Sequence, residues 1–327
     1  NPPTMAADIS SGTGYSSPAN LTVFNSKLYF SANNGINGRE LWEYDGTNPP
    51  TMTADINLGT GYSSPANLTV FNSKLYFIAD DGSSGAELWE YDGATSPTMI
   101  ADINPGTSSS WPNSLTVFNS KLYCSATDGI NGWELWEYDG ATHTMVADIN
   151  PGPFGSSSGS LTVFNSKLYF SATDGVNGRE LWEYDGTNTP TMTADINLGT
   201  TGSDPRFLTV LNSKLYFSAN NGISGKELWE YDGSNSPSMV ADIYTGANHS
   251  TPTELTAFNS KLYFRAENFL NGKELWEYNG ANTPTIVLDL YVGSGDSDPN
   301  QKTEFNGKLY FRADDGINGR ELWEYNG

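Results

Sequence analysis

The sequence is short of the side chains on which most enzymes and metal sites depend. It has one cysteine, Cys124, and two histidines, His143 and His249, in 327 residues. A single cysteine excludes a disulfide framework within the chain. Neither histidine lies in a recurring position, so neither a Ser-His-Asp or Cys-His catalytic group nor a zinc site is evident. We therefore predict that the protein is not an enzyme and holds no tightly bound cofactor.

Positive charge is also scarce. The chain has 16 Lys and Arg residues against 38 Asp and Glu, which gives a formal net charge of −22. Such a charge disfavours binding to the phosphates of nucleic acid or to an anionic membrane surface. No run of about 18 apolar residues is present, so no membrane insertion is expected. Neutral ligands, proteins and cations remain as partners.

A repeat is the dominant feature of the chain. The sequence Glu-Leu-Trp-Glu occurs seven times, at intervals of 46 or 47 residues. Self-similarity at such a period is typical of solenoids and propellers. No linker or shift in composition divides the chain, so we predict one domain over residues 1–327. The seven tryptophans are Trp42, Trp89, Trp136, Trp182, Trp229, Trp276 and Trp323.

One repeat contains four strand patterns. Residues 21–24 and 27–32 are rich in β-branched and aromatic side chains and are separated by Asn25-Ser26, which predicts a tight hairpin. A third strand is expected at 40–44 and a fourth at 50–56. Nothing in the repeat has helical periodicity.

Four short strands in each repeat, with apolar side chains on both faces, predict the blade of a β-propeller. A parallel β-helix is the rival architecture, but its coils are shorter. The chain starts with residues 1–5, which match 48–52, and stops after a third strand. We predict an all-β, seven-bladed propeller of four-stranded antiparallel blades, in which the N-terminal strand completes and closes the last blade.

The repeat motif resembles a known family. Residues 39–47 read Arg-Glu-Leu-Trp-Glu-Tyr-Asp-Gly-Thr and follow Lys-Leu-Tyr-Phe-Ser-Ala at 27–32. This pattern is similar to the ELWxxDGT repeats of large bacterial surface and secreted proteins, including cyanobacterial ones, and it covers the whole chain. The resemblance implies an extracellular or cell-surface location and no particular activity. In some repeats Asn replaces the Asp, or Ala or Ser replaces the final Thr, and these changes keep a turn-forming residue before Gly.

An aspartate recurs at the end of each fourth strand and usually opens the sequence Asp-Ile-Asn-x-Gly. Calcium prefers carboxylate and carbonyl oxygens, so a calcium site is one hypothesis for these loops. The alternative is that each Asp caps a turn by accepting bonds from backbone amides. The candidate metal ligands are Asp55, Asp102, Asp148 and Asp195.

Two positions vary among the repeats, and a propeller places both on one face. One is the residue before Glu-Leu-Trp, and the other lies in the long connection between blades. Aromatic rings with Arg, Asn and Asp are typical of sugar-binding and protein-binding surfaces. The alternative is that each ring packs onto its own loop. The candidate ligand-binding residues are Tyr15, Arg39, Tyr62, Trp111, Trp133, Phe154, Arg179 and Phe207.

These observations predict a non-enzymatic extracellular binding module, lectin-like or adhesin-like, that takes carbohydrate through the variable loops of one face. The alternative is a structural or self-assembly module of a larger surface protein, whose partners are other proteins or further copies of itself. Exposed aromatic rings in clefts between blades favour the first, and rings covered by a partner favour the second. An enzyme would require a polar cluster of unlike residues, and the sequence contains no sign of one.

Overall fold

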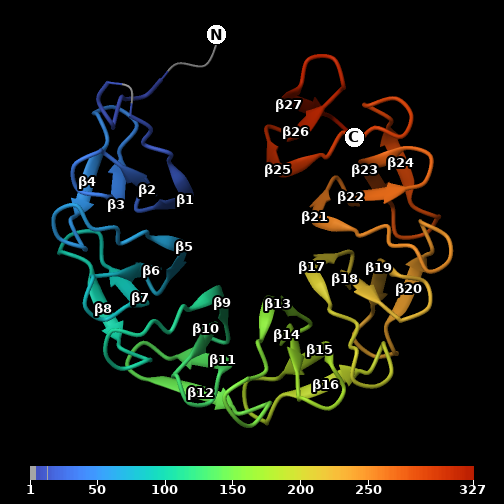
Figure 1. Cartoon of the computed structure of the whole chain (residues 1–327), viewed down its shortest axis with the longest axis horizontal. Coiled ribbons are helices and arrows are strands. Elements are labelled where there is room, and N and C mark those ends of the chain that lie inside the picture. The colour runs from blue at the N-terminus through green and yellow to red at the C-terminus, as the bar shows by residue number, and fades with distance from the viewer. Residues whose placement is uncertain (1–4, 13) are drawn as a thin grey trace. The chain divides into compact units, whose positions relative to one another are not determined.

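The computed structural model describes residues 5–12 and 14–327, and they form 27 strands joined by turns (Figure 1). The strands make seven antiparallel sheets, each built from consecutive strands of one repeat. We number these sheets blade 1 to blade 7 in chain order. The chain is a seven-bladed β-propeller, as the repeat predicts. No helix in the described part of the chain could cross a membrane.

The blades fall into two compact units, residues 1–159 and 160–327, and we describe each unit by itself. The first unit contains blades 1 to 3, and the second contains blades 4 to 7. Within a unit, the first strands of neighbouring blades contact one another, for example β1 (Ala19–Phe24) with β5 (Ala66–Phe71) and β17 (Arg206–Leu211) with β21 (Thr253–Phe258). In the six four-stranded sheets the fourth strand lies at the opposite edge (Figure 1).

The first strand of each blade carries a bulge. In blade 1, Ala19 pairs with Ser31 but Thr22 pairs with Tyr29, and the extra residue, Asn20, has a φ of +57°. Asn tolerates this left-handed conformation better than most residues do. The first strands are β1 (Ala19–Phe24), β5 (Ala66–Phe71), β9 (Asn113–Phe118), β13 (Gly159–Phe164), β17 (Arg206–Leu211), β21 (Thr253–Phe258) and β25 (Asn300–Phe305).

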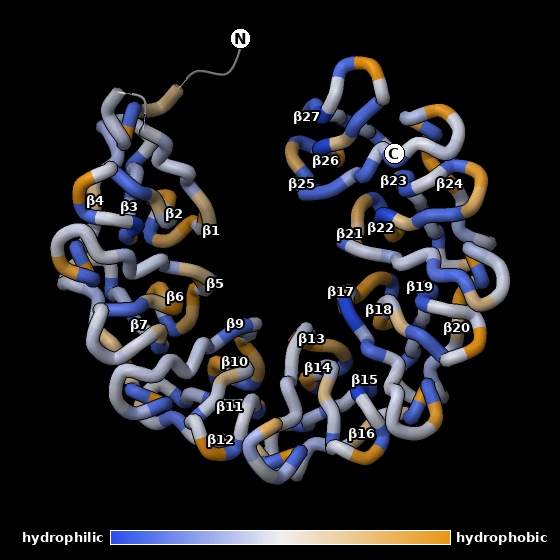
Figure 2. Tube along the Cα trace, in the orientation of Figure 1, coloured by the Kyte–Doolittle hydropathy of each residue, from blue (hydrophilic) through white to orange (hydrophobic). Residues whose placement is uncertain are grey.

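The second strand follows the first through a two-residue turn. Asn25 and Ser26 both have positive φ, at +47° and +60°, which is the hairpin turn that matches strand twist. The second strand is buried over its central residues, where it carries hydrophobic side chains (Figure 2). The second strands are β2 (Lys27–Asn33), β6 (Lys74–Asp80), β10 (Lys121–Thr127), β14 (Lys167–Thr173), β18 (Lys214–Asn220), β22 (Lys261–Asn268) and β26 (Lys308–Asp314).

The third strand contains Glu-Leu-Trp-Glu and pairs with the second without a bulge. Phe30 lies opposite Trp42 in blade 1, and Cys124 lies opposite Trp136 in blade 3. Cys124 is buried in the position that holds Phe in the other blades, and burial raises the pKa of its thiol to about 12. The third strands are β3 (Arg39–Tyr44), β7 (Ala86–Tyr91), β11 (Trp133–Tyr138), β15 (Arg179–Tyr184), β19 (Lys226–Tyr231), β23 (Gly272–Tyr278) and β27 (Arg320–Tyr325).

The fourth strand is short and lies at the sheet edge. Six blades have one in the described residues, and blade 7 has three strands there. The predicted closing strand includes residues 1–4, which lie outside the described residues, so closure of the last blade stays a prediction. The fourth strands are β4 (Thr51–Ala54), β8 (Thr98–Ala101), β12 (His143–Ala147), β16 (Thr191–Ala194), β20 (Ser238–Ala241) and β24 (Thr285–Leu288).

The core lies between neighbouring blades. Tyr29 and Leu41 of blade 1 pack against Leu75, Phe77 and Trp89 of blade 2, and the same arrangement recurs in the second unit. Within a unit, the facing sides of neighbouring blades are therefore apolar because each covers the other.

Candidate functional site

Each connection between blades is fastened by a buried glutamate, the first Glu of the repeat motif. The Glu40 carboxylate is fully buried and accepts bonds from the backbone N–H of Ile56, at 2.9 Å, and from both the N–H and the hydroxyl of Ser63. Burial raises the pKa of Glu40, and the bonds from Ser63 and Ile56 act against that rise. The same Glu-Ser pairs are Glu87–Ser110, Glu134–Ser156, Glu180–Ser203, Glu227–Ser250 and Glu274–Ser297.

These contacts between a buried Glu and a Ser, which we call the glutamate latch, bring the two variable positions together. Beside the buried Glu and Ser, the N–H of Ser64 donates to the carbonyl oxygen of Arg39, at 3.0 Å. In the next blade the N–H of Trp111 donates to the carbonyl oxygen of Ala86, at 3.1 Å. The residue before Glu-Leu-Trp therefore lies directly against the connection that follows it, as the sequence predicts.

One cavity stands out on this side of the first unit. It has a volume of about 380 Å³ and lies between blades 2 and 3. The chain has nine tryptophans, seven of them in the repeat motif, and the remaining two, Trp111 and Trp133, both line this cavity. Tyr62 lines it as well. Three of the predicted ligand-binding residues thus share one site.

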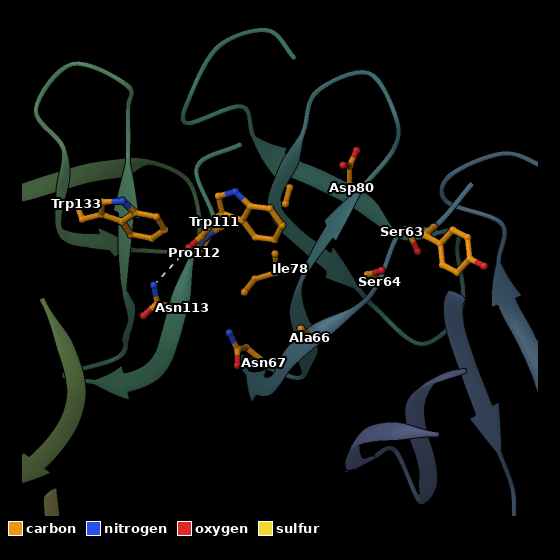
Figure 3. A pocket seen from close by; sticks show the side chains of 12 residues that line it. Ser63, Ser64, Ala66, Asn67, Ile78, Asp80, Trp111, Pro112, Asn113 and Trp133 are labelled. Carbon is orange, nitrogen blue, oxygen red and sulfur yellow. Dashed lines mark hydrogen bonds between the residues drawn. The ribbon is translucent and has the colours of Figure 1, made fainter. Parts of the chain in front are cut away.

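The floor of the cavity is apolar and its rim is polar. Ile78 and Ala86 are 6% and 3% exposed and form part of the lining. Figure 3 shows the Trp111 ring over Ile78, with Trp133 to one side and Asp80 to the other. The other lining side chains with hydrogen-bonding groups are Asn67, Asn113, Ser63 and Ser64. Flat rings over an apolar floor, with a few amides and a carboxylate, form a typical small-molecule site.

The cavity exists because the arginine side chain that fills this place in blade 1 is absent from blade 2. In blade 1 the counterparts of Ala86 and Ile78 are Arg39 and Ser31. The Arg39 Nη1 donates to the Ser17 carbonyl oxygen at 2.8 Å and to the Ser31 hydroxyl at 3.3 Å, which places the guanidinium in the corresponding space. Alanine at position 86 leaves that space open.

Blade 6 provides a second comparison. There the counterparts of Ile78 and Ala86 are Arg265 and Lys273, and the corresponding cavity measures about 20 Å³. The guanidinium of Arg265 pairs with Asp298, and the Lys273 Nζ lies 3.1 Å from Asp296. Side-chain identity at these two positions therefore decides whether a blade has a cavity.

Trp111 has an unfavourable backbone. Its φ is +46°, in the left-handed region. The same positive φ occurs at its counterparts Ser17, Ser64 and Asp204. The conformation is therefore imposed by the fold and is not caused by the tryptophan. A bulky residue in this region costs roughly 1–3 kcal/mol and is typical of functional sites. Nothing in the local fold requires an indole here, and 57% of Trp111 is exposed.

The other predicted ligand-binding residues do not join this cavity. Tyr15 and Phe154 are highly exposed, at 88% and 86%. Arg39 has the structural role given above, and Arg179 similarly donates to the Ser171 hydroxyl, at 2.9 Å. Phe207 lies in the second unit and lines a separate cavity.

The predicted metal ligands stand singly. Asp55 accepts bonds from the N–H of Gly59 and the side chain of Asn37, and Asp102 accepts one from the N–H of Gly106. The bonds to the Gly59 and Gly106 N–H groups are those of an Asp that caps a turn, which is the alternative to metal binding. Residues 5–12 and 14–327 contain no cluster of three His, Cys, Asp or Glu side chains suited to a metal ion. Metal ligation by Asp55, Asp102, Asp148 and Asp195 stays an untested prediction.

Two contributors to the cavity were not selected from the sequence. Ala86 and Ile78 carry no polar group: Ala86 leaves the space that Arg39 fills in blade 1, and Ile78 forms the apolar floor. The signal was present in the repeat alignment, because Ala86 is the only small residue at a position otherwise held by Arg, Lys or Trp.

Comparison with known proteins adds evidence on the fold. No family model matches the chain, and no curated protein sequence matches it. Among solved structures, the computationally designed Ika8 protein is 16% identical, with a TM-score of 0.56 over 96% of this chain and 88% of that one. A prolyl endopeptidase is 10% identical, with a TM-score of 0.60 over 98% of this chain, which spans about half (51%) of its length.

The β-propeller domain of the Trilobed protease from Pyrococcus furiosus is 11% identical, with a TM-score of 0.54 over 96% of each chain. Two of these three similar structures thus come from proteases or peptidases. At such low identity, similarity extends to the fold alone. By its blades and by these comparisons, the chain is a β-propeller.

Proposed function

We propose that the protein is an extracellular, non-enzymatic binding module that takes carbohydrate in the cavity between blades 2 and 3. The observation that carries the proposal is the meeting of Trp111, Trp133 and Tyr62 around one cavity. These include the only two tryptophans outside the repeat motif.

The chemistry of the lining supports a sugar ligand. The apolar face of a pyranose stacks on an indole or phenol ring, and its hydroxyls bond to amides and carboxylates. Asp80, Asn67 and Asn113 supply such groups beside the rings. The Tyr62 hydroxyl accepts a bond from the Asn33 side chain, at 3.4 Å, which helps to hold that ring in place.

The absence of catalysis and the location outside the cell are parts of the same proposal. The cavity lining contains one carboxylate, Asp80, and no histidine, cysteine or lysine, so a general acid-base pair has no second member there. The resemblance to ELWxxDGT repeats of bacterial surface and secreted proteins supports the location. The protease and peptidase activities named for similar solved structures belong to those proteins, and we do not propose them for this chain.

A glycan-array screen of the purified chain, with calcium and again with chelator, tests the proposal. We expect binding to a sugar class that is retained with chelator and lost in Trp111→Ser, which introduces the residue that blades 1 and 2 have at this position. Ile78→Ser combined with Ala86→Arg recreates the blade 1 filling and should also abolish binding. Absence of glycan binding by the wild-type chain would overturn the proposal.

A second candidate function, a protein-interaction scaffold, is favoured by a different observation. The loop between the second and third strands has an exposed aliphatic side chain at its tip in six blades. In blade 2 the same position holds Ser83. These side chains are Ile36, Ile130, Val176, Ile223, Leu270 and Ile317, at 66–87% exposure. Sedimentation of the wild type and of Ile223→Ser would detect self-association through them.

A further inference from the structure

Blade 5 begins with an arginine and a phenylalanine, which no other blade has at the equivalent positions. The first strands of blades 1 and 2 open with Ala-Asn, whereas β17 opens with Arg206-Phe207. Both side chains line a cavity of about 280 Å³, together with Ser160 and Thr162 of the neighbouring blade 4. This cavity lies entirely within the second unit.

Phe207 occupies the bulge position of its strand. Its φ is +58°, and the same position holds Asn20 in blade 1 and Asn67 in blade 2. Asparagine is suited to this conformation and phenylalanine is not. The ring is also 39% exposed, so packing only partly accounts for it. As at Trp111, an aromatic residue lies at a position whose backbone conformation disfavours it.

The surroundings of Arg206 are locally positive, in contrast to the whole chain. One carboxylate, Asp204, lies close to three cations: Lys226 Nζ at 2.7 Å, Arg206 Nε at 2.9 Å and Arg179 Nε at 3.9 Å. Of the nine Lys and Arg residues outside the recurring Lys-Leu-Tyr, all but Arg39 lie within residues 160–327. A local excess of positive charge in a chain of net charge −22 favours an anionic ligand at this point.

Arg206 has hydrogen-bonding capacity to spare. A guanidinium has five N–H donors in a planar fork, and here the Nε–H donates to Asp204. No acceptor for its Nη1 or Nη2 is found in the described residues, and 58% of the side chain is exposed. A free guanidinium edge matches a carboxylate through two parallel bonds.

We propose that this second cavity binds a uronic acid residue of an acidic polysaccharide, with Arg206 pairing with the sugar carboxylate and Phe207 stacking on the pyranose ring. The inference rests on the proposed function, since it takes the ligands of this protein to be glycans. It assigns a positively charged subsite to blade 5, separate from the tryptophan-lined site of blades 2 and 3, which contains no Lys or Arg.

The test is isothermal titration of the full chain with a galacturonic acid trisaccharide and with its methyl ester, which has the same sugar rings but carries a methyl group in place of each negative charge. The variants are Arg206→Ala and Phe207→Asn, which introduce the residues of blades 1 and 2 and are therefore compatible with the fold. The control is Ile78→Ser with Ala86→Arg, which fills the cavity of blade 2.

We expect the trisaccharide to bind the wild type and the control variant alike. The methyl ester and the Arg206→Ala variant should each lower the affinity at least about tenfold, since a bond to a charged group is lost. Phe207→Asn should weaken binding of the acid and leave its preference over the ester unchanged.

Equal affinity for the acid and the ester, or binding of the acid that Arg206→Ala leaves unchanged, would overturn the inference. In either case a neutral glycan that still binds wild type and fails to bind the control variant would leave the proposed function standing. If neither the acid nor any arrayed glycan binds, both the inference and the proposed function fail.

Discussion

At the scale of single residues, Trp111 combines an exposed indole with a backbone conformation that disfavours it. We predict that Trp111→Ser changes the free energy of unfolding by no more than about 1 kcal/mol, because relief of strain at a left-handed residue offsets the buried area that the half-exposed indole loses. Urea unfolding of the two proteins measures this. A loss of stability above about 2 kcal/mol, as for a core tryptophan, would show that the indole is structural.

Lys302 is a second residue at odds with its environment. Its side chain has no exposed area, and its position in the first strand of blade 7 is held by Leu in the other six blades. Burial lowers its pKa to about 8, and Glu254, at 3.4 Å, only partly offsets this. We predict that Lys302→Leu stabilises the protein at pH 7 by roughly 1–4 kcal/mol, as buried ion pairs replaced by apolar residues often do.

The gain from Lys302→Leu should depend on pH with a definite sign. The folded protein loses the lysine charge near pH 8, whereas the unfolded chain retains it to about pH 10.5. The wild-type penalty is therefore complete below pH 8 and fades as the pH rises toward 10.5. Unfolding free energies of both proteins at pH 7 and pH 10 test this, and a difference that grows with pH would contradict it.

The aromatic residues of the candidate site could be selected from the sequence, whereas the cavity could not. Trp111 and Trp133 stand out because they are tryptophans outside a strict repeat. A cavity depends on volume that is missing, and Ala86 indicates missing volume only once Arg39 is seen to fill the equivalent space. For a similar reason the sequence does not single out Arg206, because its importance depends on the cations that the fold gathers around Asp204.

At the scale of elements, the strand order follows directly from the repeat, and the strand ends depend on contacts that are distant in sequence. The sequence predicts the fourth strand of blade 1 over residues 50–56, and in the structure this strand extends over Thr51–Ala54. It ends early because the Ile56 N–H donates to the Glu40 carboxylate and not to a neighbouring strand. That bond joins residues 16 positions apart, so local sequence preference does not reveal it.

The glutamate latch itself leads to a prediction for one connection. Ser203→Ala removes the hydroxyl that donates to Glu180 Oε2 at 2.5 Å, and leaves a buried carboxylate with one bond fewer. We expect a loss of roughly 1.5–3 kcal/mol, the range for a hydrogen bond to a charged group. Native-state hydrogen exchange should locate the loss, with the amides of residues 196–203 exchanging faster than those of β14 and β15.

A matched control for Ser203→Ala exists in the same unit. Ser234 also donates to a carboxylate, that of Asp232 at 3.0 Å, but in an exposed turn where blades 2 and 3 have alanine. Ser234→Ala should change stability by less than about 0.5 kcal/mol. Equal effects of the two substitutions would show that the buried latch contributes no more than a surface turn.

At the scale of the whole molecule, the latch makes stability depend on pH. Burial raises the pKa of six glutamates above that of an exposed Glu, and raises that of Glu274 to about 6. Such groups stabilise the folded state fully below pH 4.5, and this contribution is lost as the pH rises through the folded pKa. The other five are Glu40, Glu87, Glu134, Glu180 and Glu227.

Two other sets of groups act in the opposite direction. Burial lowers the pKa of His143 to about 4, so the folded state loses stability as the pH falls from 6.5 to 4. Asp residues of the turns, such as Asp92 and Asp139, have pKa values lowered by backbone N–H donors. Their contribution is present above pH 3.8 and is lost only in stronger acid, outside the window considered for the glutamates.

We therefore predict that the free energy of unfolding of His143→Gln, which lacks the opposing group, increases as the pH is lowered from 7.5 to 5. The wild type should show a smaller increase. Glu274 alone should contribute about 1 kcal/mol, since a shift of one pKa unit corresponds to about 1.4 kcal/mol. Adding Glu274→Gln should reduce the gain by that amount. Urea titrations at the two pH values, followed by tryptophan fluorescence, measure each difference within one variant, so any effect of a substitution on stability at pH 7.5 cancels. A flat or falling stability of His143→Gln on acidification would mean that the buried carboxylates are ionised as easily in the folded chain as in the unfolded one, and that the connections between blades are held in some other way.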